Sequence, residues 1–151
     1  MQRSSLALAL ALSFFSAACG STAHQRVPMP DPKVEVTRAD LARIYFVRES
    51  SVGLHRSEVV VFDGEREIGT LEKGTFLCWE RAGGRTLGRA FYAAVDPSKG
   101  KVEGVVDLDC AAGKAHYFRV TVDREGGQPR VEALDAAEGR KRVAECAPAG
   151  G

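Results

Sequence analysis

Short β-prone runs separated by turn residues fill the chain from about residue 42 to residue 134, and they constrain the fold more than any other feature. The runs are rich in β-branched and aromatic residues, which favour pleated, half-buried surfaces. Glycine-, aspartate- and lysine-containing turns separate them at the short spacing that is typical of a sandwich. The runs span residues 42–48, 57–62, 65–72, 75–80, 87–95, 102–110, 115–124 and 130–134. We therefore predict an all-β fold, a small antiparallel β-sandwich of about seven to eight strands.

Strict alternation in the run "AHYFRVTVDR" (115–124) predicts which of its side chains face the core. Successive side chains of a strand point to opposite faces of the sheet. His116 and Phe118 therefore share an apolar face with the two valines that follow, whereas Tyr117 and Arg119 lie on the other face. We expect His116 to lie in the core or at its rim.

Local signals mark one hairpin and one helix. Asp63 and Gly64 lie between two runs and are a strong signal for a tight hairpin turn, because glycine tolerates positive φ. Further along, Asp135 precedes "AAEGRKRVAE" (136–145); its side chain can accept a backbone hydrogen bond while Glu138 reaches back, as in a capping box. These residues predict a short C-terminal helix that its internal glycine weakens.

The N-terminus has the features of a cleaved secretory signal. Arg3 gives it a positive start, and "LALALALSFF" (6–15) is shorter than the ~20 apolar residues of a membrane-spanning helix. The small residues of "SAAC" directly before Cys19 resemble a bacterial lipobox, although Ser16 stands where that pattern prefers an aliphatic residue. We predict that residues 1–18 are a lipoprotein signal peptide and that Cys19 is acylated. The alternative is an ordinary signal peptide that leaves Cys19 unmodified.

Acylation of Cys19 would attach the protein to the bacterial cell envelope. One buried acyl chain holds only marginally, and the resemblance to lipoproteins implies two or three chains on this cysteine. Gly20 follows Cys19 where an Asp would favour the inner membrane, so we expect the outer membrane, with the domain facing the periplasm. Residues 19–37 contain three prolines and predict a flexible tether with a reach of up to ~50 Å.

The charge of the chain is balanced. The full sequence has 21 Lys and Arg and 20 Asp and Glu, and loss of Arg3 with the signal peptide leaves 20 basic residues (21 − 1 = 20). A nucleic-acid partner requires a basic surface that displaces counterions from phosphates, so we expect none. Residues 38–146 have the size of one β-sandwich domain, and we expect residues 147–151 to be a disordered tail.

Several stretches together resemble a known bacterial family. They are "ARIYFVRESSVGLHRSEVVVFDGEREIGTLEKGTF", "GGRTLGRAF", "AAGKAHYFRVTV" and "LDAAEGRKRV". These stretches are similar to the DUF2846-type lipoproteins, which contain a domain of unknown function, over about residues 40–143. The resemblance implies a small β-sandwich on a lipid anchor and carries no activity over. Cys78 departs from the family pattern, so the resemblance implies no shared role for the cysteines.

Three cysteines remain after Cys19, and outside the cytoplasm they favour a disulfide. Cys78 and Cys110 both lie at strand ends beside turns, so we predict that they form the bridge. A bridge between Cys110 and Cys146, which would fix the helix to the sheet, is the alternative. No pair has the Cys-x-x-Cys spacing of a redox enzyme.

Two places are candidate binding sites. The segment "RAGGRTLGR" combines glycine amides with Arg81, Arg85 and Arg89 and could hold an anion, although it lacks the pattern of a phosphate loop. We expect it to be a hairpin loop that supplies the arginines. His116 and Tyr117, neighbours on the most regular strand, are the second candidate.

Metal and acid–base chemistry find little support in the sequence. Metal sites need three or four converging ligands, and His24, His55 and His116 are scattered along the chain, so we predict no metal site. Asp107 and Asp109 share a strand face through pleating alone, and we interpret them as a solvated surface. We expect no cofactor other than the lipid on the anchor cysteine.

The sequence therefore favours a membrane-anchored envelope lipoprotein that is not an enzyme and acts as a protein-interaction module. The contact regions that we expect are the loops at 50–56 and 81–89, because loops on a rigid scaffold commonly carry binding. The alternative is a lipoprotein that binds a small ligand or a metal. An envelope protein is the expected partner in the first case.

Overall fold

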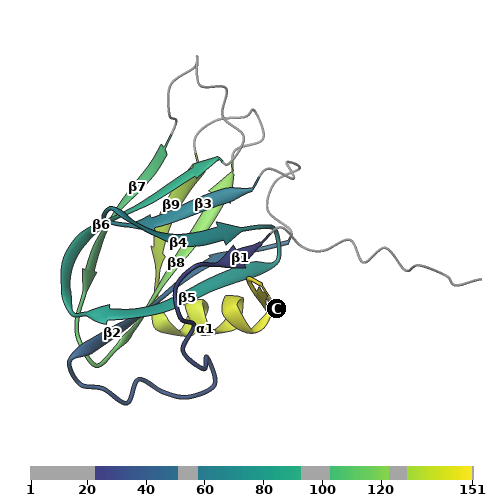
Figure 1. Cartoon of the computed structure of the whole chain (residues 1–151). Coiled ribbons are helices and arrows are strands. Elements are labelled where there is room, and N and C mark those ends of the chain that lie inside the picture. The colour runs from purple at the N-terminus through teal and green to yellow at the C-terminus, as the bar shows by residue number, and fades with distance from the viewer. Residues whose placement is uncertain (1–22, 51–57, 93–102, 123–128, 151) are drawn as a thin grey trace, which may run out of the picture.

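The computed structural model describes residues 23–50, 58–92, 103–122 and 129–150, and it confirms the predicted β-sandwich (Figure 1). Two five-stranded sheets face each other, and one short helix follows them in the chain. Sheet A has, in spatial order, β1 (His24–Gln25), β4 (Arg66–Leu71), β3 (Val59–Asp63), β6 (Gly84–Tyr92) and β7 (Glu103–Cys110). Sheet B has β10 (Ala147–Pro148), β5 (Thr75–Ala82), β2 (Leu41–Arg48), β8 (Ala115–Val122) and β9 (Pro129–Leu134). The helix is α1 (Ala136–Ala144).

The eight longer strands in the described part of the chain coincide with the eight predicted runs to within a few residues. Two differences stand out. The two-residue strands β1 and β10 have no counterpart in the prediction, and sheet B is mixed rather than antiparallel, since β2 runs parallel to β8 and β10 parallel to β5. Turn signals report only on neighbours in sequence, and β2 and β8 are far apart along the chain.

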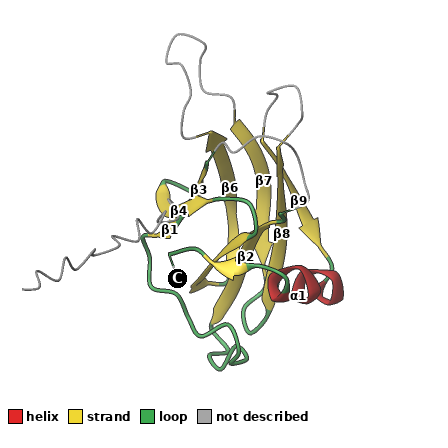
Figure 2. Ribbon diagram, turned by 90° about the vertical axis from the view of Figure 1, so that its right-hand side faces the viewer, coloured by secondary structure: helices red, strands yellow, loops and turns green. Residues whose placement is uncertain are grey.

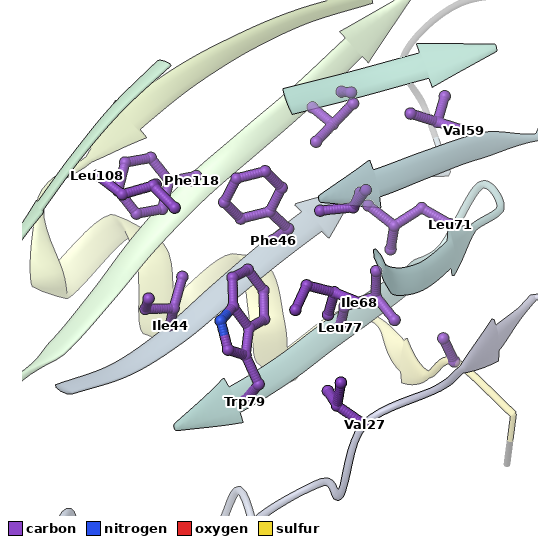
Figure 3. Packing of buried hydrophobic residues seen from close by; sticks show 14 of the residues in the cluster. Val27, Ile44, Phe46, Val59, Ile68, Leu71, Leu77, Trp79, Leu108 and Phe118 are labelled. Carbon is purple, nitrogen blue, oxygen red and sulfur yellow. The ribbon is translucent and has the colours of Figure 1, made fainter. Parts of the chain in front are cut away.

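The main core lies between the two sheets and is built around three aromatic rings (Figure 3). Phe46 on β2 packs with its centroid 5.3 Å from that of Trp79 and 5.2 Å from that of Phe118. These rings come from three adjacent strands of sheet B, because the register aligns β2 with both β5 and β8. As predicted, Phe118 faces this core while Tyr117 faces away from it.

The outer face of sheet B carries a second apolar cluster, which α1 covers in part (Figure 2). Strand β2 is therefore buried on both of its faces. A strand that is covered on both sides needs apolar residues at consecutive positions rather than at alternate ones. This explains why the run "ARIYFVR" lacks the alternation of β8. The fold thus has three layers: sheet A, sheet B and α1.

The predicted hairpin and helix cap are both present. Gly64 has φ +60° in the turn between β3 and β4. Asp135 caps α1, with its Oδ1 accepting hydrogen bonds from the backbone N–H groups of Ala137 and Glu138 at 2.9 Å each. The side chain of Glu138 instead accepts a hydrogen bond from Arg142 one turn later, so only one half of the predicted capping box forms.

Residues 23–27 belong to the sandwich, although we expected the tether to extend to residue 37. Ala23 and Val27 are buried in the main core, and Arg26 donates its backbone N–H to the Ile68 carbonyl at 2.8 Å. Gly69 permits this approach, because a Cβ there would lie 2.9 Å from the Gln25 Cα. The prediction missed β1 because two residues of pairing leave no pattern in the sequence.

The expected disordered tail also differs, since residues 147–149 extend sheet B. Ala147 donates its backbone N–H to the Gly74 carbonyl at 2.8 Å, and Ala149 donates to the Phe76 carbonyl at 2.9 Å. Ala149 is buried. The predicted signal peptide at 1–18 and Cys19 lie outside the described residues. No helix in the described ranges is long and apolar enough to cross a membrane.

Candidate functional site

A groove of about 790 Å³ lies on the outer face of sheet B. Tyr45, Phe76 and Tyr117 contribute to its floor. Residues of α1 line it on one side, and residues 32–36, which we name the strap, line it on another. This size is within the range of pockets that bind small molecules, and its mixture of aromatic floor and a few polar groups is typical of such pockets.

The strand register builds the aromatic floor. Tyr45 on β2 is aligned with Tyr117 on β8, and their rings stack with centroids 4.9 Å apart at an interplanar angle of 11°. The ring of Phe76 on β5 lies 6.1 Å from that of Tyr45. Tyr45 and Tyr117 are only 3% and 7% exposed, so water reaches little of this surface. Burial raises the pKa of both tyrosines, which keeps their hydroxyl groups protonated as hydrogen-bond donors.

Arg43 holds the strap against the sheet. Its guanidinium donates from Nε and Nη2 to Glu80 Oε1 at 2.9 and 2.7 Å. Its Nη1 donates to the backbone carbonyls of Asp31, at 3.0 Å, and Val34. Because the Arg43 side chain is only 6% exposed, these bonds form a buried link between the strap and strands β2 and β5. Arg43 therefore positions one wall of the groove.

Helix α1 lies unusually close to the floor because of Gly139. This glycine is buried, and a Cβ at its position would lie 2.7 Å from Cδ2 of Tyr117 and closer still to Cβ and Cγ. Only glycine allows the helix backbone to rest on the tyrosine ring at this distance. Arg140 and Val143 follow on α1 and line the groove.

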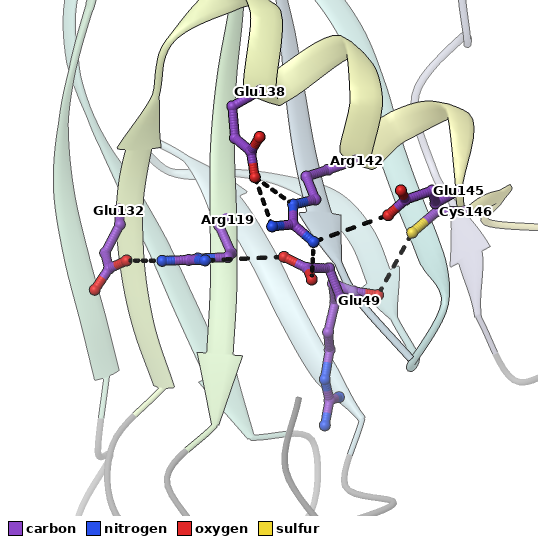
Figure 4. A network of polar contacts seen from close by, with 8 residues as sticks. Glu49, Arg119, Glu132, Glu138, Arg142, Glu145 and Cys146 are labelled. Carbon is purple, nitrogen blue, oxygen red and sulfur yellow. Dashed lines mark hydrogen bonds and ion pairs between the residues drawn. The ribbon is translucent and has the colours of Figure 1, made fainter. Parts of the chain in front are cut away.

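An ion-pair network fixes the position of α1 on sheet B (Figure 4). Glu49, at the end of β2, accepts a hydrogen bond from Arg142 Nη1 on its Oε2 at 2.8 Å. Arg142 also pairs with Glu138, at 2.5 Å, and with Glu145, at 3.8 Å. The Glu49 side chain is only 8% exposed, so its contact with Arg142 is screened less than a surface ion pair would be. The network gives α1 a fixed position over the sheet.

The three predicted binding arginines are not gathered in one loop. Residues 81–89 form the end of β5, a corner at Gly83, and β6, where the chain passes from sheet B to sheet A. A Cβ at Gly83 would lie 2.8 Å from the backbone N of Ala112, so the corner requires a residue without a side chain. The prediction of a hairpin loop at this place is therefore wrong. A corner between two sheets and a hairpin both use glycine, so the sequence did not distinguish them.

Arg81 has a structural role between the sheets. Its Nε lies 3.1 Å from Asp63 Oδ2, which also accepts a hydrogen bond from Trp79 Nε1 at 2.8 Å. Its remaining donors bind the backbone carbonyls of Ala82, Gly84 and Leu108. Arg81 thus closes one end of the core and has few donors left for a ligand.

Arg85 and Arg89 lie instead on the outer face of sheet A. Arg85 is 71% exposed and is 3.9 Å from Asp107. The Arg89 guanidinium lies over the rings of Phe62 and Phe91, 5.7 Å from each centroid, and the two rings meet edge to face at 5.3 Å. The interpretation of Asp107 as a solvated residue agrees with its 65% exposed side chain.

The two remaining candidates separate as the strand alternation predicts. His116 Nε2 lies 3.0 Å from the Ala111 carbonyl oxygen, so this contact occupies one nitrogen of the ring. Tyr117 enters the floor of the groove. The expected loop at 50–56 lies almost entirely outside the described residues, apart from Ser50.

The predicted disulfide between Cys78 and Cys110 is not present, since Cys78, Cys110 and Cys146 are free thiols. Cys110 lies in the core between the sheets, whereas Cys78 and Cys146 belong to the cluster on the outer face of sheet B. Sheet B therefore separates Cys110 from both possible partners. Position beside a turn suggested proximity, but it does not reveal which face of a sheet a cysteine occupies.

No known family, curated protein or solved structure matches the chain. The resemblance to DUF2846-type lipoproteins therefore stays a prediction. Within the described ranges, no group of three or more His, Cys, Asp and Glu side chains is arranged to hold a metal ion.

Sequence reasoning found one residue of the groove, Tyr117, and missed most of the others. The strap lies in the segment that we interpreted as a tether because of its prolines. Arg43 and Arg140 have no motif around them in the sequence that marks them as groove residues. One signal was available in the sequence: residues 44–47 are apolar at four consecutive positions. A strand segment without a polar face must be covered on each side, and β2 is buried in this way.

Proposed function

We propose that this chain is a lipid-anchored, non-enzymatic binding module of the bacterial cell envelope, and that a small molecule with an apolar body occupies the groove on sheet B. The observation that carries this proposal is a groove of about 790 Å³ with an aromatic floor between two walls. Each wall is fixed in place by its own polar contacts. Arg43 fixes the strap, and the Glu49–Arg142 contact fixes α1. Such a preformed site binds without a large ordering cost.

The thiol in the groove supports binding rather than catalysis. Cys146 lines the groove, but burial, followed by the negative charges of Glu49 and Glu145, raises its pKa to about 11. The reactive form of cysteine is the thiolate, which is scarce at neutral pH when the pKa is that high. Cys146 is therefore a poor nucleophile and serves as part of an apolar wall.

Anchoring through Cys19 would hold the domain close to the membrane. Ala23 is already buried in the core, so only residues 20–22 separate it from the lipidated cysteine. A fully extended chain spans at most about 3.6 Å per residue, which limits this link to roughly 15 Å. The reach is much shorter than the ~50 Å of a tether that extended to residue 37. The module would thus act at the membrane surface.

Binding can be tested on residues 20–151, which contain every described strand and α1 and omit only the signal peptide and the lipidated cysteine. The probe is N-phenyl-1-naphthylamine, a neutral molecule whose fluorescence rises in apolar surroundings. Ala115→Trp should fill the groove, which Ala115 lines, and weaken binding at least tenfold. Thr121→Trp, on the same face of β8 but roughly 20 Å away, is the matched control. Equal binding by both variants would contradict the proposal.

A protein contact through the outer face of sheet A is the second candidate function. Leu87 and Val105 on this face are 48% and 49% exposed, beside the Phe62, Arg89 and Phe91 group. Exposed apolar side chains that lie together commonly mark interaction sites. A photo-crosslinker at position 87 in cells should give one defined envelope-protein adduct, whereas one at the exposed position 141 on α1, beyond the outer face of sheet B, serves as the position control. Absence of any adduct at position 87 would remove this candidate.

A further inference from the structure

The charges that line the groove are unequal. Lys33 and Arg140 carry positive charge, and Glu35 carries the negative charge. The charge of the fourth ionic residue, Arg43, is compensated by its hydrogen bonds with Glu80. The lining therefore has an excess of one positive charge beside an apolar floor.

Arg140 is the cation best placed to bind a ligand. It lies close enough to the Tyr117 hydroxyl to oppose, in part, the rise that burial causes in the pKa of that tyrosine. In the described part of the chain Arg140 forms no ion pair with a carboxylate, whereas Arg142, two residues later, pairs with Glu49, Glu138 and Glu145. One arginine of α1 thus fixes the helix, and the other keeps its charge at the groove.

We infer that the ligand of this groove is an anionic amphiphile, with its aromatic or hydrocarbon body on Tyr45, Phe76 and Tyr117 and its acid group at Arg140. This inference rests on the proposed function and specifies the chemistry of its ligand. The guanidinium supplies paired donors that suit a carboxylate, sulfonate or phosphate group. The Tyr117 hydroxyl beside it supplies a further donor. Lys33 on the strap adds positive charge to the same groove.

The lining of the groove favours this assignment over a purely apolar ligand, because it combines apolar and charged side chains. The two tyrosines are almost completely buried, so contact with the exposed part of the floor stabilises any ligand only a little, and the charged groups must add to it. Val34 on the strap, in contrast, is 48% exposed and lines the groove together with the cations. A molecule with one apolar end and one acidic end matches both surfaces at once.

Two probes that differ in one acidic group test the inference on residues 20–151. They are 1-anilinonaphthalene-8-sulfonate and its neutral counterpart N-phenyl-1-naphthylamine, which lacks the sulfonate. We expect the sulfonate to bind roughly 3–10-fold more tightly at low salt, as a charge-assisted contact at a partly exposed site provides. Added salt should reduce this preference, because it screens the charges.

Arg140→Gln should abolish the preference for the sulfonate, measured as the ratio of the dissociation constants of the two probes. Arg140→Lys should retain part of the preference. Lys141→Gln, which removes the same charge from the next residue of α1, is the matched control, because Lys141 does not line the groove. Melting temperatures of the three variants check that each is folded.

The outcomes separate this inference from the proposed function. If the neutral probe binds in the groove as tightly as the sulfonate, or if Arg140→Gln and Lys141→Gln change the preference equally, the anionic ligand is refuted and the binding module stands. If neither probe responds to Ala115→Trp, the groove is not a binding site and both are refuted. A preference that depends on Arg140 alone supports both.

Discussion

Replacement of Gly139 by alanine tests how closely α1 is fitted to the floor of the groove. In an exposed helix this change stabilises by about 1 kcal/mol, because glycine has the greater conformational freedom when unfolded. Here the added Cβ would lie 2.7 Å from Cδ2 of Tyr117 and closer to two further atoms of that side chain. Normal contacts between carbon atoms are about 3.5–4.0 Å, so the helix or the Tyr117 side chain, including its Cβ, must move by more than about 1 Å.

Neither the Tyr117 side chain nor α1 can move without a cost in free energy. The Tyr117 ring is stacked on Tyr45 at 4.9 Å and is 7% exposed. The helix is fixed by the contact between Arg142 and Glu49. Overpacking of a well-filled site costs typically about 1–3 kcal/mol, and the gain in helix propensity offsets about 1 kcal/mol of that. We expect Gly139→Ala to lower the free energy of unfolding by up to about 2 kcal/mol.

Urea unfolding followed by tryptophan fluorescence measures this effect, since Trp79 is the single tryptophan of the chain and is buried in the core. The control is the same substitution in a Tyr117→Gly background, which removes all three of the side-chain atoms that the new Cβ would meet. In that background Gly139→Ala should be neutral or stabilising by up to about 1 kcal/mol. If Gly139→Ala stabilises the chain with Tyr117 in place, the close approach of α1 to the sheet is refuted.

Three further predictions concern the ion pairs and the thiols. Glu49→Gln should lower the unfolding free energy by about 2–3 kcal/mol, whereas Glu132→Gln, at a 50% exposed carboxylate, should cost less than about 1 kcal/mol in the same urea titration. Asp63→Asn should cost about 1–3 kcal/mol and alter the fluorescence of Trp79, because it weakens two contacts of one buried carboxylate. Burial raises the pKa of Cys78 from 9.0 to about 12, so this thiol should resist iodoacetamide at pH 8 until urea is added. The free energy of unfolding should decline above about pH 9, because the unfolded chain loses the thiol proton there and the folded chain keeps it. A mass spectrum that shows a disulfide would contradict the structure, in which Cys78 is a free thiol.

The main strands of this fold could be predicted from the sequence, because residue types close together in the chain determine where strands and turns form. The eight runs became the eight longer strands, and Asp63–Gly64 and Asp135 did what their side chains and backbone freedom favour. The pattern of apolar and turn residues could not predict which distant segments pair with each other. The parallel alignment of β2 with β8 depends on how the chain crosses between sheets, and no residue of either strand reports it.

The groove was harder to predict than the sheets, because three elements of different kinds form it. Tyr117 could be assigned to the outer face from alternation alone, but nothing in that strand shows what lies above the face. The strap is held by Arg43 through backbone carbonyls, which every residue has, so the segment leaves no side-chain signal of its docking. The same reason explains why β1 and β10 were missed: they join the sheets through backbone bonds at two residues each.

Glycine 139 shows why an apparent weakness in the sequence deserved a different interpretation. Read by helix propensity alone, a glycine inside a nine-residue helix is a defect that costs about 1 kcal/mol. In the structure it is the position at which α1 rests on Tyr117, directly before Arg140, which lines the groove. A larger residue would raise the helix from the floor and move the cation of Arg140 away from the tyrosine hydroxyl. The local loss of helix stability and the geometry of the proposed anion site therefore have the same origin, so Gly139→Ala should weaken binding of the sulfonate probe more than binding of the neutral one.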